Sequence, residues 1–168
     1  RPMDLTRAWL SSMANWADVR RMLPSVAVAG TGGGRKSVVN AAVLPPAISE
    51  QELIWELPDA GRVLCYHRPG TGRPLLLLHS INAAPSAFEV SPFFDRLTLD
   101  RPLYAPDLPG FGRSARADRP YRPEFFATAI LQMIDAIGAD SVDVLALSTT
   151  AEFAARAAIG LGALVKVF

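Results

Sequence analysis

Residues 144–154 read VLALSTTAEFA and decide the fold expected of this chain. Before Ser148 the residues are mostly apolar and of types that favour strands, whereas the alanines after it favour a helix. A strand that turns into a helix at a serine holds the hydroxyl on a tight bend at the carboxyl edge of a sheet, facing the first amides of the helix. We therefore interpret Ser148 as a candidate nucleophile. Taken alone, a serine at this position is more often a helix N-cap.

Two earlier segments favour the same kind of sheet. Residues 74–82, PLLLLHSIN, form an apolar run that stops at a histidine, and such runs are typical of buried parallel strands. Residues 102–114, PLYAPDLPGFGRS, contain another strand end followed by a turn rich in glycine and proline. Three strand ends, each followed by a loop and a helical stretch, predict an α/β fold with a mostly parallel sheet flanked by helices.

In order and spacing, these segments resemble the α/β-hydrolase superfamily, and the resemblance covers about residues 50–168. His79-Ser80-Ile81 is similar to the H-G-x loop after the third strand of that family. Residues 107–114, DLPGFGRS, are similar to its D-x-P-G-x-G-x-S loop after the fourth strand. Residues 146–150, ALSTT, stand where the family has the nucleophile elbow G-x-S-x-G.

The chain departs from the family pattern at three glycine positions, which are occupied by Ser80, Ala146 and Thr150. Alanine is small and should cost little at the elbow. Thr150 is β-branched and bulkier at the point where the helix must pass close to the strand, so it predicts a looser turn.

The resemblance implies acyl transfer without a cofactor or a metal. Ser148 Oγ would attack the carbonyl carbon of a small-molecule acyl substrate, and the backbone amides of Ile81 and Thr149 would form the oxyanion hole. A serine at the elbow argues against dehalogenases with a carboxylate nucleophile and lactone hydrolases with a cysteine. Esterase, lipase, amidase, C–C hydrolase and haloperoxidase-like activities remain open.

In this superfamily the catalytic acid and histidine follow the serine, but residues 149–168 contain neither Asp nor His. Both histidines, His67 and His79, precede Ser148; we interpret His79 as a scaffold residue and Asp107 as an acceptor for amides of its own loop. We therefore expect an amino-terminal part of a hydrolase, truncated at the start of the sixth strand and lacking its acid and base. The alternative is a non-catalytic hydrolase-fold binding protein or an inactive fragment.

Composition is that of a globular domain with no nucleic-acid signature. Half of the 168 residues are apolar and the net charge is +1. Cys65 is the only cysteine, so the sequence contains neither a disulfide framework nor a zinc cluster. No apolar run approaches the ~20 residues of a membrane span. We expect a cytoplasmic protein, and the sequence does not indicate its oligomeric state.

Residues 1–45 are expected to form a helix and a glycine-rich linker, separate from a hydrolase core at 46–168. Apolar residues recur at helical spacing within 4–22, which favours a helix packed on the domain. Its tryptophans and the Arg20–Arg21 pair leave contact with a membrane surface as the alternative. Residues 30–37 imitate a phosphate-binding loop, but Arg35 replaces its second glycine, so we interpret the segment as a flexible linker rather than a nucleotide site.

The remaining pattern predicts the order of elements along the core. Strands are expected at 50–57, 62–68, 74–79, 102–106, 142–147 and 163–168, and helices at 86–97, 123–137 and 151–160. Pro92 should kink the first of these helices or mark its start.

Overall fold

The computed structural model describes residues 44–98, 100–161 and 165–167. The helix at 4–22 and the glycine-rich segment at 30–37 that the sequence predicts lie outside these ranges.

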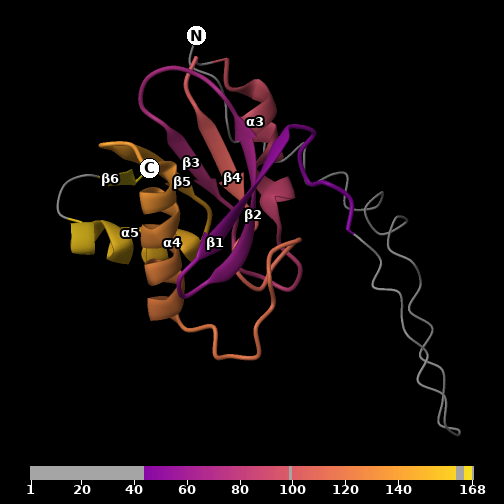
Figure 1. Cartoon of the computed structure of the whole chain (residues 1–168), viewed down its shortest axis with the longest axis vertical. Coiled ribbons are helices and arrows are strands. Elements are labelled where there is room, and N and C mark those ends of the chain that lie inside the picture. The colour runs from indigo at the N-terminus through magenta and orange to yellow at the C-terminus, as the bar shows by residue number, and fades with distance from the viewer. Residues whose placement is uncertain (1–43, 99, 162–164, 168) are drawn as a thin grey trace, which may run out of the picture. The chain divides into compact units, whose positions relative to one another are not determined.

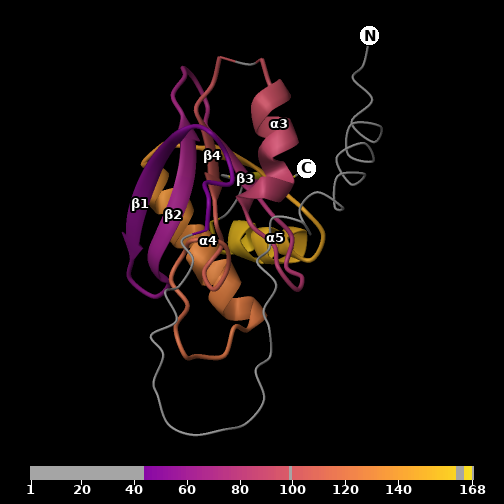
Figure 2. The same cartoon turned by 90° about the vertical axis from the view of Figure 1, so that its right-hand side faces the viewer.

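The described strands form one six-stranded sheet in the order β1-β2-β4-β3-β5-β6. The antiparallel pairs β1–β2 and β2–β4 lie at one side, and β3 pairs in parallel with β4 and β5, as β5 does with β6. Figure 2 shows β1, β2, β4 and β3 side by side in that order. The mostly parallel sheet predicted from the sequence is therefore confirmed. The strands are β1 (Gln51–Leu57), β2 (Gly61–Arg68), β3 (Leu75–Leu78), β4 (Leu103–Pro106), β5 (Val142–Ala146) and β6 (Val165–Val167).

Helices fill the connections between the parallel strands. The helix predicted at 86–97 is instead two short elements, the 3₁₀ turn η1 (Ala87–Val90) and the helix α3 (Ser91–Arg96). Pro92 lies in the first turn of α3 and cannot continue a preceding helix, which explains the division. Helix α4 (Pro123–Ile137) begins at a proline and ends at Gly138, which has φ 69°, both as predicted. Helix α5 spans Thr150–Leu161.

Strand β3 separates two apolar cores because successive side chains point to opposite faces of a sheet. Leu76 and Leu78 pack in the cluster that α4 and α5 cover, and Leu75 and Leu77 pack in the cluster beneath η1 and α3. Figure 1 shows α3 on the other side of the strands from α4 and α5. All four leucines are buried, which explains why this strand reads as an unbroken apolar run.

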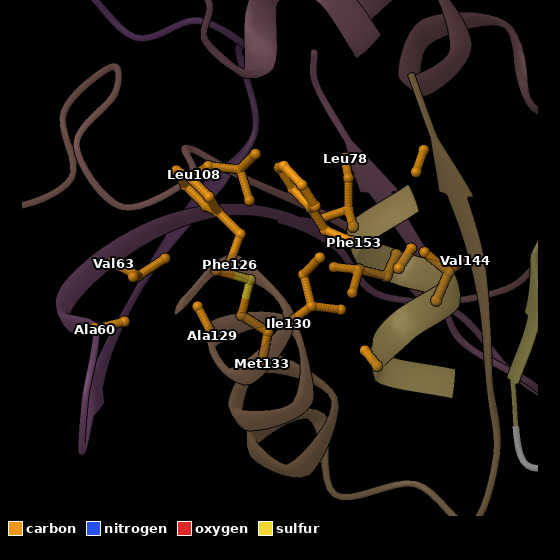
Figure 3. Close-up of a cluster of buried hydrophobic side chains, with 14 of the residues drawn as sticks. Ala60, Val63, Leu78, Leu108, Phe126, Ala129, Ile130, Met133, Val144 and Phe153 are labelled. Atoms are coloured by element: carbon orange, nitrogen blue, oxygen red, sulfur yellow. The ribbon is translucent and has the colours of Figure 1, made fainter. Parts of the chain in front are cut away.

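The core beneath α4 and α5 reaches the carboxyl edge of the sheet. Figure 3 shows Leu78, Leu108, Phe126 and Phe153 gathered there, and the rings of Phe126 and Phe153 stack with their centroids 5.3 Å apart. This packing fixes the base on which the loops after β3, β4 and β5 stand. Among the described residues, no helix is long and apolar enough to cross a membrane.

Candidate active site

Ser148 lies on the bend between β5 and α5. Its backbone has φ 55°, and it is the one non-glycine residue with a positive φ among those described. The bend is closed by hydrogen bonds from Thr150 N–H to Leu147 O at 3.2 Å and from Ala151 N–H to Ser148 O at 3.0 Å. The serine is exposed, and its Oγ makes no hydrogen bond within the described part of the chain. The N-cap alternative therefore does not explain this residue.

The left-handed conformation of Ser148 is the strained geometry typical of a nucleophile elbow. It costs a non-glycine residue on the order of 1–2 kcal/mol and persists only where surrounding structure enforces it. Such strain occurs preferentially at functional sites, because it presents a side chain that a relaxed turn would turn away.

The loop after β3 is bound directly to the elbow. Leu147 N–H donates to Leu78 O at 3.0 Å, and the hydroxyl of Thr150 donates to His79 O at 2.8 Å. Thr150 is fully buried. The side chain that was predicted to loosen the elbow therefore fits at the start of α5 and joins it to the neighbouring loop.

The two predicted oxyanion-hole residues lie on these joined segments. Thr149 directly follows Ser148, and Ile81 is the third residue of the loop after β3. Ile81 is half-buried and packs on the same core as Phe111 and Ala151. Within the described residues, neither the Ile81 nor the Thr149 backbone N–H has a hydrogen-bond partner in the chain. Both amides remain candidates for binding an anion.

His79 connects the loops after β3 and β4 and is fully buried. Its Nε2 accepts a hydrogen bond from Leu108 N–H at 2.9 Å, so the proton of the neutral ring lies on Nδ1, which donates to Ser80 O at 2.7 Å. Burial lowers the pKa of His79 below its ordinary value of 6.5, outweighing the hydrogen bond to Ser80 that raises it. Both nitrogens are occupied, so the structure confirms His79 as a scaffold residue.

The loop after β4 is organised around the buried carboxylate of Asp107. Its oxygens accept hydrogen bonds from Arg113 N–H in its own loop, as predicted, and from Ala87 N–H in η1, which was not predicted, each at 2.8 Å. A Cβ on Gly112 would lie 2.1 Å from Asp107 Cγ, so only glycine fits there. The hydroxyl of Ser114 donates to Asp107 O at 2.6 Å and accepts from Leu64 N–H at 2.9 Å, which ties the loop to β2.

Glu89 is a residue of the site that the sequence did not reveal. Its carboxylate accepts hydrogen bonds from Ser80 N–H and from Asn82 Nδ2, each at 2.9 Å. The Asn82 side chain also accepts from Ala84 N–H at 3.1 Å, consistent with a turn-stabilising role. Glu89 lies in η1, whose position over the loop depends on tertiary packing, so no sequence signal marked it.

The other titratable candidates lie away from Ser148. His67 is paired with Tyr104 in the β2–β4 ladder, toward the amino end of β4, and its Nδ1 lies 3.1 Å from Leu103 O. Asp143 is the second residue of β5 and pairs with Arg101 at 2.6 Å. Burial tends to raise the pKa of Asp143, but hydrogen bonds from Arg101 and Arg73 lower it overall. Neither group is a catalytic partner for Ser148.

The described residues offer no alternative chemistry at a metal or a reactive thiol. No group of three or more His, Cys, Asp and Glu side chains in that part of the chain could hold a metal ion. Cys65 is fully buried in β2, and burial raises the pKa of its thiol, so it is an inert core residue.

Comparisons with known proteins agree with this fold. Rat (Rattus norvegicus) 1-acylglycerol-3-phosphate O-acyltransferase ABHD5 is 38% identical over 72 residues, which are 43% of this chain and 18% of that protein. The haloalkane dehalogenase DatA from Agrobacterium tumefaciens C58 is 25% identical with a TM-score of 0.60, covering 69% of this chain and 40% of that structure. N-formylmaleamic acid deformylase from Pseudomonas putida S16 is 27% identical with a TM-score of 0.59, covering 68% of this chain and 44% of that structure.

This chain therefore spans less than a fifth of the length of its curated relatives and less than half of the similar solved structures. The sequence profile of the alpha/beta hydrolase family matches residues 75–167, more than half of the chain and all three loops of the site. On this match, the chain belongs to the alpha/beta hydrolase family.

Proposed function

We propose that Ser148 is the nucleophile of a serine hydrolase that cleaves an ester or a related acyl bond. The observation that carries the proposal is the strained, exposed position of this serine, whose φ of 55° has no counterpart among the other described non-glycine residues. Functional strain of this kind is expected where a hydroxyl must reach a substrate above the sheet edge.

The proposed reaction begins with attack of Ser148 Oγ on the substrate carbonyl carbon while its proton passes to a general base. The carbonyl oxygen becomes an oxyanion, which the amides of Ile81 and Thr149 stabilise by hydrogen bonds. Collapse of this intermediate expels the alcohol or amine with a proton and leaves an acyl-serine, which water then hydrolyses. Loss of one oxyanion donor costs about 3 kcal/mol of transition-state stabilisation, so the two amides matter as much as the hydroxyl.

Neither histidine of the sequence, His67 or His79, is placed to act as the general base that this proposal needs. His79 is a poor base because its Nε2 accepts from Leu108 N–H and its Nδ1–H donates to Ser80 O. Glu152, the one acidic residue after Ser148, is engaged by Arg156 at 2.7 Å. We accordingly expect these residues to show little turnover without the remainder of the catalytic machinery.

Names of two similar proteins support an acyl substrate. The rat relative is named for transfer of an acyl group, and the Pseudomonas putida structure is that of a deformylase, which removes the smallest acyl group. The similarity to a haloalkane dehalogenase would favour a haloalkane substrate instead, but this chain has a serine rather than a carboxylate on the elbow. An acyl bond is thus the substrate class that the nucleophile and these relatives share.

A fluorophosphonate probe tests the proposal, because it phosphonylates activated serines. The native, full-length protein should be labelled on the peptide that contains Ser148, and Ser148→Ala should abolish that labelling. Ser141→Ala, at the opposite end of β5, is the matched control and should label like the wild type. Absence of labelling at Ser148 in the wild type would contradict the proposal.

The second candidate is a hydrolase-fold protein that uses the same site only for binding. It is favoured by Thr150, which stands at the elbow in place of the glycine of the family pattern. Binding of an acyl ligand without phosphonylation of Ser148 would support this function over the first.

A further inference from the structure

Thr150 makes a contact that the glycine of the family pattern has no side chain to make. It is the first residue of α5, it is fully buried, and its hydroxyl donates to the His79 carbonyl at 2.8 Å across 71 positions of sequence. A buried hydroxyl without a partner would be costly, so this bond specifies where the loop after β3 sits against the elbow.

The same peptide group is held from its other side. The carbonyl of His79 and the N–H of Ser80 belong to one planar peptide unit. Thr150 donates to that carbonyl, and Glu89 Oε2 accepts from that N–H at 2.9 Å. With both polar ends bound, the unit cannot rotate without breaking one of the two hydrogen bonds. We call this peptide, with its Thr150 and Glu89 contacts, the peptide clamp.

The next amide along the chain after the peptide clamp is that of Ile81, the predicted oxyanion donor. Its own peptide unit includes Ser80 O, which accepts from His79 Nδ1–H at 2.7 Å, and only two backbone torsions at Ser80 join that unit to the peptide clamp. The direction of the Ile81 amide therefore depends on both the His79 bond and the peptide clamp. A donor for an oxyanion has to be in place before the charge develops, since reorganising it during the reaction would cost part of its stabilisation.

We propose that Thr150 is a positioning residue that, through the peptide clamp, aims the Ile81 amide at the oxyanion formed on Ser148. This role rests on the proposed function of Ser148. Thr150 does not touch the substrate, and its effect is on the rate of the covalent step rather than on binding. The hydroxyl, and not the bulk of the side chain, carries the role.

Two substitutions separate the hydroxyl from the bulk. Thr150→Val replaces the hydroxyl with a methyl group and keeps the branched shape, whereas Thr150→Ser keeps the hydroxyl and loses the methyl group. The measurement is phosphonylation of the native, full-length protein by a fluorophosphonate, resolved into the maximal rate kinact and the binding constant KI. The thermal midpoint of each variant is recorded alongside.

We expect Thr150→Val to lower kinact at least about tenfold, since a lost oxyanion donor elsewhere costs on the order of a hundredfold or more. KI should stay within about twofold, and Thr150→Ser should restore most of kinact. Unchanged kinact in Thr150→Val, or equal losses in both variants, would overturn the role of the hydroxyl.

Glu89 provides a second route should Thr150→Val fail to fold. Glu89→Gln keeps an oxygen that can accept from Ser80 N–H, and Glu89→Leu removes it. The peptide clamp predicts a loss of kinact in Glu89→Leu with near wild-type kinact in Glu89→Gln, and equal rates for the two would overturn it. A wild type that is not labelled at Ser148 overturns the proposed function itself, whereas a labelled wild type with insensitive variants overturns only the positioning role.

Discussion

The loop after β4 and the elbow after β5 stand at the same edge of the sheet but treat the family's glycines differently. In the β4 loop, Gly112 has φ 49° and no room for a side chain, because the buried Asp107 carboxylate occupies that space. At the elbow, Thr150 stands in for a glycine and is accommodated in the interior with a hydrogen bond to His79 O. A glycine of the family pattern is thus required where a fixed polar group occupies the space that a side chain would need. It is replaceable where that space contains a hydrogen-bond acceptor for the new side chain.

The largest effect expected from this comparison is that of Gly112→Ala. The new methyl group would have to displace Asp107 from its bonds with two amides while the backbone keeps a left-handed φ, so we expect a loss of about 4 kcal/mol in the free energy of unfolding. Chemical denaturation measures it. Gly138→Ala is the control: it has φ 69° with nothing within 4 Å of the new Cβ, and should cost only about 1 kcal/mol. Equal losses of unfolding free energy in the two variants would show that the left-handed backbone, and not the lack of space beside Asp107, makes glycine necessary at 112.

The next effect concerns the carboxylate itself. Asp107→Asn places an amide where two oxygens accept N–H groups from Ala87 and Arg113, so at least one of these buried donors loses its acceptor. We expect a loss of about 2 kcal/mol, read as a lower denaturant midpoint with an unchanged slope. Wild-type stability in this variant would contradict the central role of Asp107 in the loop.

A smaller effect is expected at the elbow when the family glycine is restored. Thr150→Gly removes a buried side chain and the bond to His79 O and adds a flexible residue at the start of α5. We expect a loss of roughly 1–2 kcal/mol rather than a gain. A gain in the thermal midpoint would mean that threonine strains the elbow, as its bulk alone predicts.

The smallest effect is a pH dependence that comes from His79. Its folded-state pKa is lowered by burial, so the unfolded chain binds more protons below the ordinary value of 6.5. Stability should therefore be complete above about pH 6.5 and decline as the pH falls below it. Denaturation at a series of pH values measures this decline, and His79→Gln should flatten it between pH 6.5 and 5. If the unfolding free energy of His79→Gln declined with falling pH as steeply as that of the wild type, the decline would come from other groups.

The sequence predicted most of the sheet because its strands are short apolar or alternating runs bounded by turn residues. It also predicted the tight bend at Ser148 and the role of Asp107 as an acceptor for a loop amide, since both follow from local geometry. Pro92 indicated a kink or a helix start within 86–97, and the structure has the start of α3 there, after the separate turn η1. The contacts of Thr150 with His79 and of Glu89 with Ser80 depend on how distant segments pack, so no local pattern could indicate them.

The account depends most on Ser148 and the two amides acting together on one oxyanion. A crystal structure of the native, full-length protein after reaction with a fluorophosphonate tests this directly. We predict a covalent bond between Ser148 Oγ and phosphorus, with one phosphonyl oxygen about 2.7–3.1 Å from both the Ile81 and the Thr149 backbone nitrogens. An adduct on another residue, or a phosphonyl oxygen directed away from these two nitrogens, would contradict it.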